Sequence, residues 1–126
     1  MPLARISLRE GSTAAHRKAI ADSLQRALVE TFNVPADDRF QIIDEYPADR
    51  LLFDRDYLGI HRSDGFVAIQ LTVSNTRTVA QKQALYRRIV ELLADDPGLD
   101  PRDVFINLVE VVKENWSFGN GVAQYV

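Results

Sequence analysis

A proline stands at position 2, directly after the initiator methionine. Initiator methionine is normally removed before a small residue, and its removal would leave the secondary amine of Pro2 as the N-terminus. Such an amine can accept or donate a proton, and it can attack a carbonyl carbon. Many chains begin with Met-Pro and make no use of it, so Pro2 alone identifies no activity.

Two charged residues are candidates for acting on a small acid. Arg77 follows an apolar segment, where its guanidinium can hold a carboxylate through two parallel hydrogen bonds, or can simply be solvated in a loop. Asp38 precedes an expected strand, where it can orient a water or a substrate group, or cap a turn beside Arg39.

Two aromatic residues, Trp116 and Phe118, flank Ser117 near the C-terminus. They can form the wall of an apolar pocket, or they can make an edge packing or subunit contact. His16 and His61 are expected in solvent, and neither has neighbours that suggest a catalytic triad. With no cysteine and only two histidines, the sequence predicts neither a metal site nor a thiol nucleophile. No glycine-rich phosphate loop is present, and no cofactor is expected.

Six elements must position these residues. A period-two alternation predicts a strand over 3–9, and apolar spacings of three and four predict helices over 13–32 and 78–94. Further strands are expected over 39–46, 66–74 and 104–111, and the last is expected to be central because it is almost continuously apolar. The segment 47–62 shows no clear period, and it is expected to be a loop with a short strand or turn.

The two halves correspond at an offset of about 65 residues, with Thr13 matching Thr78 before each helix. This indicates a duplicated β-α-β unit within one domain, 1–126, with halves at about 1–46 and 66–111. We therefore expect an α+β fold, a four-stranded mixed sheet with two helices on one face. The tail, 112–126, is expected to add a short strand or hairpin. The uncovered sheet face predicts oligomerisation.

The composition excludes several classes of protein. Its 126 residues suit one domain, and 46% hydrophobic with 26% charged residues is ordinary for a globular protein. A net charge of −3 argues against a nucleic-acid partner. No apolar run approaches the ~18 residues that span a membrane, and no signal-peptide core is present, so a cytoplasmic location is expected.

Four stretches together resemble the tautomerase superfamily, and within it the malonate semialdehyde decarboxylase group: MPLARISLREG, FNVPADDRFQ, SNTRTVAQK and ENWSFGNG. The resemblance extends over nearly the whole chain. It implies a β-α-β homotrimer in which Pro2, freed of Met1, is the catalytic group. It also implies that Asp38 is an auxiliary acid, that Arg77 binds substrate and contributes to catalysis, and that Trp116 and Phe118 form part of an apolar wall.

The sequence departs from that family at Asn75, which stands where the decarboxylase has the first of two arginines. Asparagine can hydrogen-bond a substrate carboxylate but supplies no charge, so we expect Asn75 to bind substrate more weakly. A hydrogen bond to a charged group contributes roughly 1.5–3 kcal/mol, or ~10- to 100-fold in rate. The named decarboxylation therefore does not transfer directly to this chain.

The resulting hypothesis is an enzyme that uses Pro2 on small enol or oxo carboxylic acids. Tautomerisation is the favoured reaction, followed by decarboxylation or hydration, and the physiological substrate is left open. The alternative is a non-catalytic trimeric module that binds a ligand or a partner. Retention of Met1 would favour this alternative, because the proline nitrogen would then be an amide.

Overall fold

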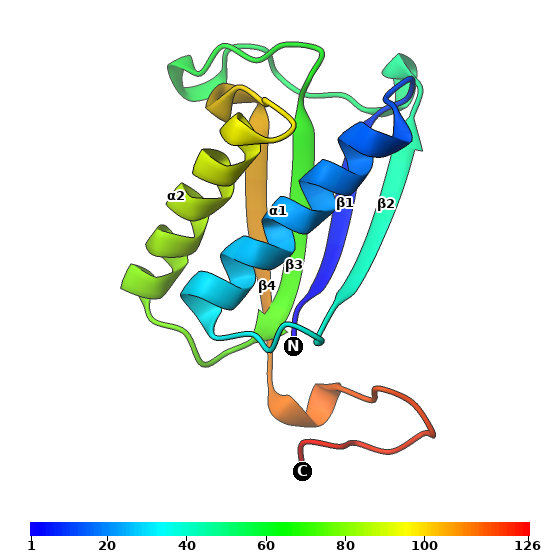
Figure 1. Ribbon diagram of the computed structural model, residues 1–126, viewed down its shortest axis with the longest axis vertical. Coiled ribbons are helices and arrows are strands. Elements are labelled where there is room, and N and C mark those ends of the chain that lie inside the picture. The colour runs from blue at the N-terminus through cyan, green and yellow to red at the C-terminus, as the bar shows by residue number, and fades with distance from the viewer.

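A computed structural model describes residues 1–126 as a four-stranded sheet with two helices packed on one face (Figure 1). The sheet order is β2-β1-β3-β4, with β1–β2 and β3–β4 parallel and β1–β3 antiparallel. The α+β mixed-sheet prediction is thereby confirmed. The element bounds are β1 Leu3–Arg9, α1 Ala14–Phe32, β2 Phe40–Tyr46, β3 Val67–Ser74, α2 Val79–Asp95 and β4 Val104–Val111.

The two helices begin in the same way, which supports the duplication. The Thr13 hydroxyl accepts a hydrogen bond from the backbone N–H of His16, and the Thr78 hydroxyl accepts one from that of Gln81. Each bond satisfies an amide that a helix start would otherwise leave unpaired. Both N-cap residues are threonines 65 positions apart, so the two β-α-β units are in register.

The core lies between the helices and the sheet. Each strand of the central pair sends alternate side chains toward the helices, as the period-two pattern predicts. Burying one such aliphatic side chain stabilises the fold by about 1.5–3 kcal/mol. The fully buried isoleucine and leucine residues are Ile6, Ile20, Leu24, Leu28, Ile69, Leu71, Leu85, Ile89 and Leu93.

The prediction that the fourth strand is central is wrong, because β4 lies at an edge of the sheet. The apolar residues of β4 lie on both faces of the sheet. Ile106 and Leu108 pack against the core, whereas Phe105 and Val109 are exposed by 50% and 39%. The continuous apolar run therefore reflects an uncovered sheet face as well as the core.

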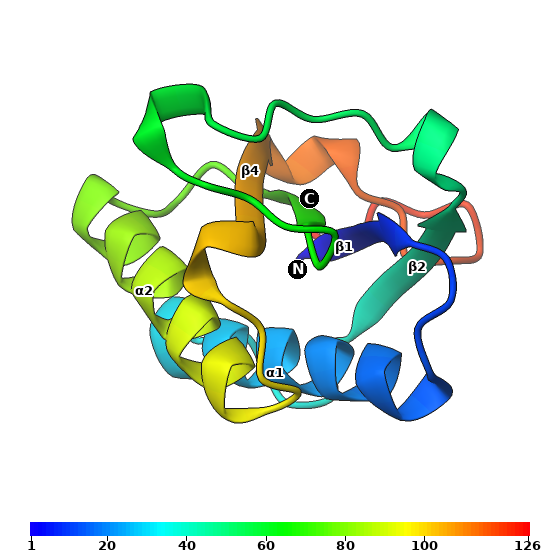
Figure 2. The ribbon, with the colours of Figure 1, turned by 90° about the horizontal axis from the view of Figure 1, so that it is seen from above.

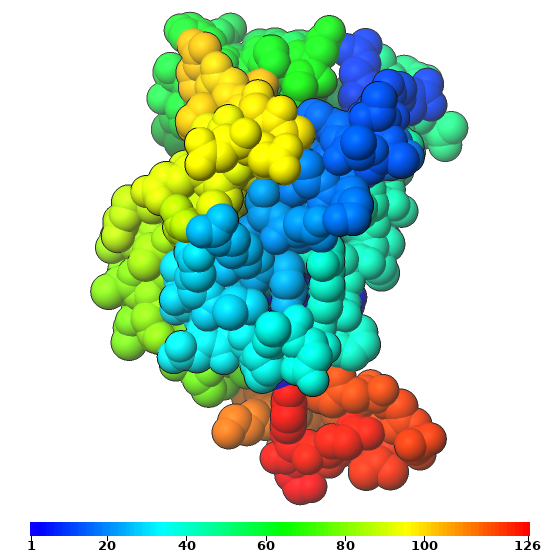
Figure 3. Space-filling model, viewed as in Figure 1, coloured from blue at the N-terminus to red at the C-terminus, as the bar shows by residue number.

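The expected C-terminal strand or hairpin is also wrong for this chain, since residues 112–126 contain only one 3-10 turn, Lys113–Asn115, and irregular backbone. Gly119, Asn120 and Gly121 all have positive φ, and this curls the segment. The Gln124 side chain closes the curl by bonding the backbone of Phe118 and Gly119. In Figure 3 this tail forms a separate lobe beyond the body of the molecule.

The sheet face opposite the helices is only partly covered. The connection between β2 and β3 crosses that side and contains the 3-10 turns Ala48–Arg50 and Tyr57–Gly59, as Figure 2 shows. Leu52 in this connection is 83% exposed. Apolar side chains exposed over one face are typical of a protein–protein contact surface. Neither helix is long and apolar enough to cross a membrane.

An ion pair joins the two helices and gives a pH-dependent prediction. Hydrogen bonds from Arg88 and then Arg26 lower the pKa of Glu30 from 4.5 to about 2. Since the folded-state pKa is depressed, this stabilisation is present above about pH 4.5 and is lost as pH falls through about 2. We expect the difference in urea midpoint between wild type and Glu30→Gln to shrink over that range.

The matched control for Glu30→Gln is Glu10→Gln, because Glu10 is exposed and its side chain makes no ion pair. Its urea midpoint should follow the wild-type midpoint at every pH. A gap between wild type and Glu30→Gln that stays constant from pH 5 down to about pH 2 would contradict this account.

Candidate functional site

Several chain segments meet at one edge of the sheet, the edge that is formed by the ends of the strands and not by the side of an outer strand. Because β1 is antiparallel to β3, the start of β1 lies where β3 ends, and the parallel pairing brings the start of β2 and the end of β4 to the same edge. The end of α1 also reaches this edge, as Figure 1 shows near the N-terminus. Strand ends held by a sheet are where functional side chains commonly lie.

A cavity of 480 Å³ opens at this edge. Three of its ten lining residues are apolar, so its wall is mainly polar and charged. The lining residues are Met1, Asn33, Val34, Pro35, Asp38, Ser74, Thr76, Arg77, Lys113 and Tyr125.

The N-terminal ammonium of Met1 lies 2.6 Å from Asp38 Oδ2, and both side chains are only 14% exposed. Two hydrogen bonds fix the backbone of Asp38. Its carbonyl accepts one from the buried Gln25 side chain at 3.1 Å. Its backbone N–H donates to the Pro35 carbonyl at 3.0 Å. The carboxylate is therefore fixed against the N-terminal nitrogen of the chain.

Arg77 is oriented by uncharged partners. Its Nη2 donates to the Phe32 carbonyl at 2.7 Å, and its Nη1 donates to the Thr76 hydroxyl at 3.0 Å. The guanidinium also lies over the Phe32 ring at 4.9 Å. Arginine has five N–H donors, so three remain after these two bonds. Arg77 can therefore bind a carboxylate without giving up an existing ion pair.

Tyr125 closes one side of the cavity, and its hydroxyl contacts the Met1 sulfur. Burial, followed by the nearby charge of Asp38, raises the pKa of Tyr125 above its ordinary value of 10.0. The phenol is thus neutral near pH 7 and can donate a hydrogen bond. Phe118 packs edge-on against Tyr125 with ring centroids 5.0 Å apart, and Trp116 stacks on Phe118 at 5.5 Å.

The structure brings some of the residues selected from sequence together and separates others. Asp38 and Arg77 both line the cavity. Pro2 is buried, with Met1 lining the cavity in its place. Asn75 is exposed and outside the lining, while its backbone N–H donates to the Val111 carbonyl at 3.0 Å.

The aromatic pair, Trp116 and Phe118, lies behind Tyr125 and does not itself line the cavity. Among the lining residues with an ionisable side chain, sequence reasoning missed two, Tyr125 and Lys113. Lys113 lies two residues beyond the end of β4, and β4 runs parallel to the strand before Arg77, so the argument that selected Arg77 could have selected Lys113. Tyr125 carries no comparable signal, because its position depends on the irregular tail.

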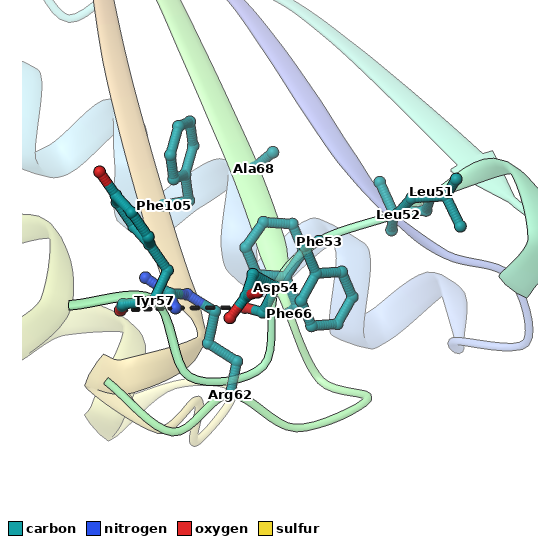
Figure 4. Close-up of a pocket in the computed structure, with 9 residues that line it drawn as sticks. All are labelled: Leu51, Leu52, Phe53, Asp54, Tyr57, Arg62, Phe66, Ala68 and Phe105. Atoms are coloured by element: carbon teal, nitrogen blue, oxygen red, sulfur yellow. Dashed lines mark hydrogen bonds between the residues drawn. The ribbon is translucent and has the colours of Figure 1, made fainter. Parts of the chain in front are cut away.

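A second cavity of 370 Å³ lies on the open sheet face, between the β2–β3 connection and the sheet. Figure 4 shows Phe53 against Phe66, whose rings stack at 4.1 Å. Seven of its nine lining residues are hydrophobic, and the Arg62 guanidinium donates only to backbone carbonyls. This cavity offers a mainly apolar contact surface. It also contains the carboxylate of Asp54, the phenol of Tyr57 and the guanidinium of Arg62, but that guanidinium is occupied by backbone carbonyls and no terminal amine lines the space.

The 480 Å³ cavity combines a carboxylate, a guanidinium and a phenol around the N-terminal nitrogen. Together these groups can bind a small anion and exchange protons with it. No group of three or more His, Cys, Asp or Glu side chains is placed to hold a metal ion.

Comparison with known proteins gives consistent matches. A family described as "Tautomerase enzyme" matches residues 38–119, and a second family with the same description matches residues 2–61. The Bacillus subtilis (strain 168) protein named "Probable tautomerase YusQ" is 37% identical over 126 residues, which cover 100% of this chain and 99% of that protein.

Two solved structures share the fold closely. A malonate semialdehyde decarboxylase, described with decarboxylase and hydratase activities, gives a TM-score of 0.93 at 32% identity over 98% of this chain and 95% of that one. A malonate semialdehyde decarboxylase inhibited by 3-bromopropiolate gives 0.92 at 39% identity over 98% and 93%. This chain therefore belongs to the tautomerase superfamily and, within it, to the group that resembles malonate semialdehyde decarboxylase.

Proposed function

We propose that the chain, once Met1 is removed, uses the Pro2 amine to transfer protons on small enol or oxo carboxylic acids. The observation that carries this proposal is the position of the chain's N-terminal end. The ammonium of Met1 lies 2.6 Å from Asp38 Oδ2, in a cavity that Arg77 also lines. Removal of Met1 would enlarge the cavity at the wall that this residue forms. It would also make the ring nitrogen of Pro2 the terminal amine beside Asp38.

In tautomerisation, Arg77 holds the substrate carboxylate while the neutral Pro2 amine takes the proton of the enol hydroxyl. The electron pair of the C=C bond then takes a proton from the resulting ammonium at carbon, which gives the oxo acid and restores the amine. Burial and the Arg77 charge favour the neutral amine, whereas Asp38 favours the ammonium. Asp38 orients a water or the substrate carbonyl, and the aromatic cluster around Tyr125 limits access of solvent.

The same groups support two further reactions. An ammonium form of Pro2 can polarise a carbonyl as a general acid, for hydration. A neutral form can add to the carbonyl of a 3-oxo acid and lose water, and the iminium then accepts the electron pair released with CO2. Tautomerisation is the preferred assignment, because it needs only one proton donor and acceptor. Asn75 lies outside the cavity, so position 75 supplies no second contact to the substrate carboxylate of the kind that an arginine would make.

The test compares two preparations of the same chain, separated by intact mass into forms with and without Met1. We expect tautomerisation of small enol acids only in the form that begins at Pro2. In the other form the proline nitrogen is an amide and neither accepts a proton nor attacks a carbonyl. Equal rates in both forms would exclude the Pro2 amine from the reaction.

A second candidate function is a binding module without catalysis. In a chain that keeps Met1, the terminal ammonium pairs with Asp38 at the cavity wall, and the proline nitrogen is an amide. This candidate predicts that natural protein retains Met1 and turns over no enol acid while still binding small carboxylates. The intact mass of protein from its own cells separates the two candidates.

For the assembly, we propose a homotrimer in which the open sheet face is covered by other copies. Phe105 is 50% exposed on that face, and the second cavity adds a mostly apolar hollow beside it. The trimer would supply the layer that a sheet with two apolar faces requires.

A further inference from the structure

The cavity holds more positive than negative charge. Asp38 is its only acidic lining residue, and the N-terminal ammonium already pairs with that carboxylate at 2.6 Å. Two further cations, Arg77 and Lys113, line the same space. With the terminal amine protonated, the ammonium and Asp38 offset each other and two positive charges remain. With the amine neutral, as the proposed reaction requires, the cavity still has one positive charge in excess.

Neither remaining cation has a carboxylate partner. Arg77 bonds to a carbonyl and a hydroxyl, which carry no formal charge. Lys113 is exposed, and its ammonium makes no ion pair or hydrogen bond within the chain. By contrast, Lys18 and Lys82, the chain's other lysines, each pair with an acidic side chain at 2.6 and 2.7 Å.

The sheet brings these two cations to the same edge. Arg77 follows β3 and Lys113 follows β4, and in the parallel register Ser74 lies opposite Val111. The hydrogen bond from the Asn75 N–H to the Val111 carbonyl fixes the two strand exits side by side at 3.0 Å. The backbone at both positions is therefore held near the ends of two paired strands.

We infer that the site takes small dicarboxylic acids, with Arg77 binding the carboxylate next to the reacting carbons and Lys113 binding the second one. This inference rests on the proposed function, from which the role of Arg77 comes. Lys113 is then a residue that sets specificity, and it provides a positive charge that Asn75 does not. A monocarboxylic acid would leave the Lys113 charge unused.

The test uses binding alone, with fumarate and crotonate as probes. These two acids share a trans double bond, and they differ in that fumarate has a carboxylate where crotonate has a methyl group. In protein without Met1, calorimetry at low ionic strength should give a Kd for fumarate about fivefold to tenfold below that for crotonate. In Lys113→Gln the ratio should fall to about twofold or less, the statistical advantage of two equal carboxylates.

Lys18→Gln is the matched control, because it removes the same charge from α1, away from the cavity. It should keep the wild-type ratio. A wild-type ratio near two, or a high ratio that survives in Lys113→Gln, would overturn the inference. Failure of the proposed function would appear differently, as a preserved preference for fumarate without turnover of any enol acid.

Discussion

Replacement of Pro2 with alanine is expected to lower kcat/KM for enol-acid tautomerisation about 100- to 10,000-fold, the usual contribution of a positioned acid–base group. Alanine also permits removal of Met1, so the variant still begins with an amine. That amine is primary, more strongly hydrated and free to rotate. In Pro2, by contrast, the nitrogen is held within the pyrrolidine ring, and this residue is buried directly before β1. The loss therefore reflects the position and basicity of the nitrogen.

Steady-state kinetics on protein of verified intact mass checks this prediction. Pro47→Ala is the matched control, because Pro47 follows β2 at the far end of the strand and lies outside the cavity. Its rate should match wild type. If Pro2→Ala keeps the wild-type rate with Met1 absent, proton transfer by the terminal proline is excluded.

The fold could be predicted closely because its signals are local and repeated. The strands at 3–9 and 104–111 have the predicted bounds, and both helices start one residue after the predicted threonine. Period and capping depend on neighbouring residues, so one sequence suffices to show them. The position of β4 in the sheet depends on pairing between distant segments, and an apolar run does not reveal whether its second face is covered.

The candidate site could be predicted in part for the same reason. Arg77 and Asp38 lie beside strand ends, and strand ends can be recognised from the sequence. The relation of Trp116 and Phe118 to the cavity could not be predicted, because the positive φ values at Gly119, Asn120 and Gly121 curl the tail. That curl brings Tyr125, and not the two earlier aromatic residues, to the cavity wall.

Replacement of Arg77 with methionine is expected to raise KM for a small enol acid about 10- to 100-fold and to change kcat by much less. A hydrogen bond to a charged group contributes roughly 1.5–3 kcal/mol, and an anchor that acts equally on ground and transition states changes KM alone. Arg77→Lys should fall between wild type and Arg77→Met, since lysine keeps the charge and loses the paired hydrogen bonds.

Arg77 also bonds the Phe32 carbonyl at the end of α1, so the variants could lose stability as well as binding. Thermal unfolding with and without a saturating carboxylate separates the two effects, because lost affinity reduces only the shift caused by ligand. Arg87→Met is the control, since Arg87 is exposed on α2 and makes no ion pair. If Arg77→Met keeps the wild-type KM and ligand shift, the carboxylate must bind elsewhere, and the cavity would lose its assigned anchor.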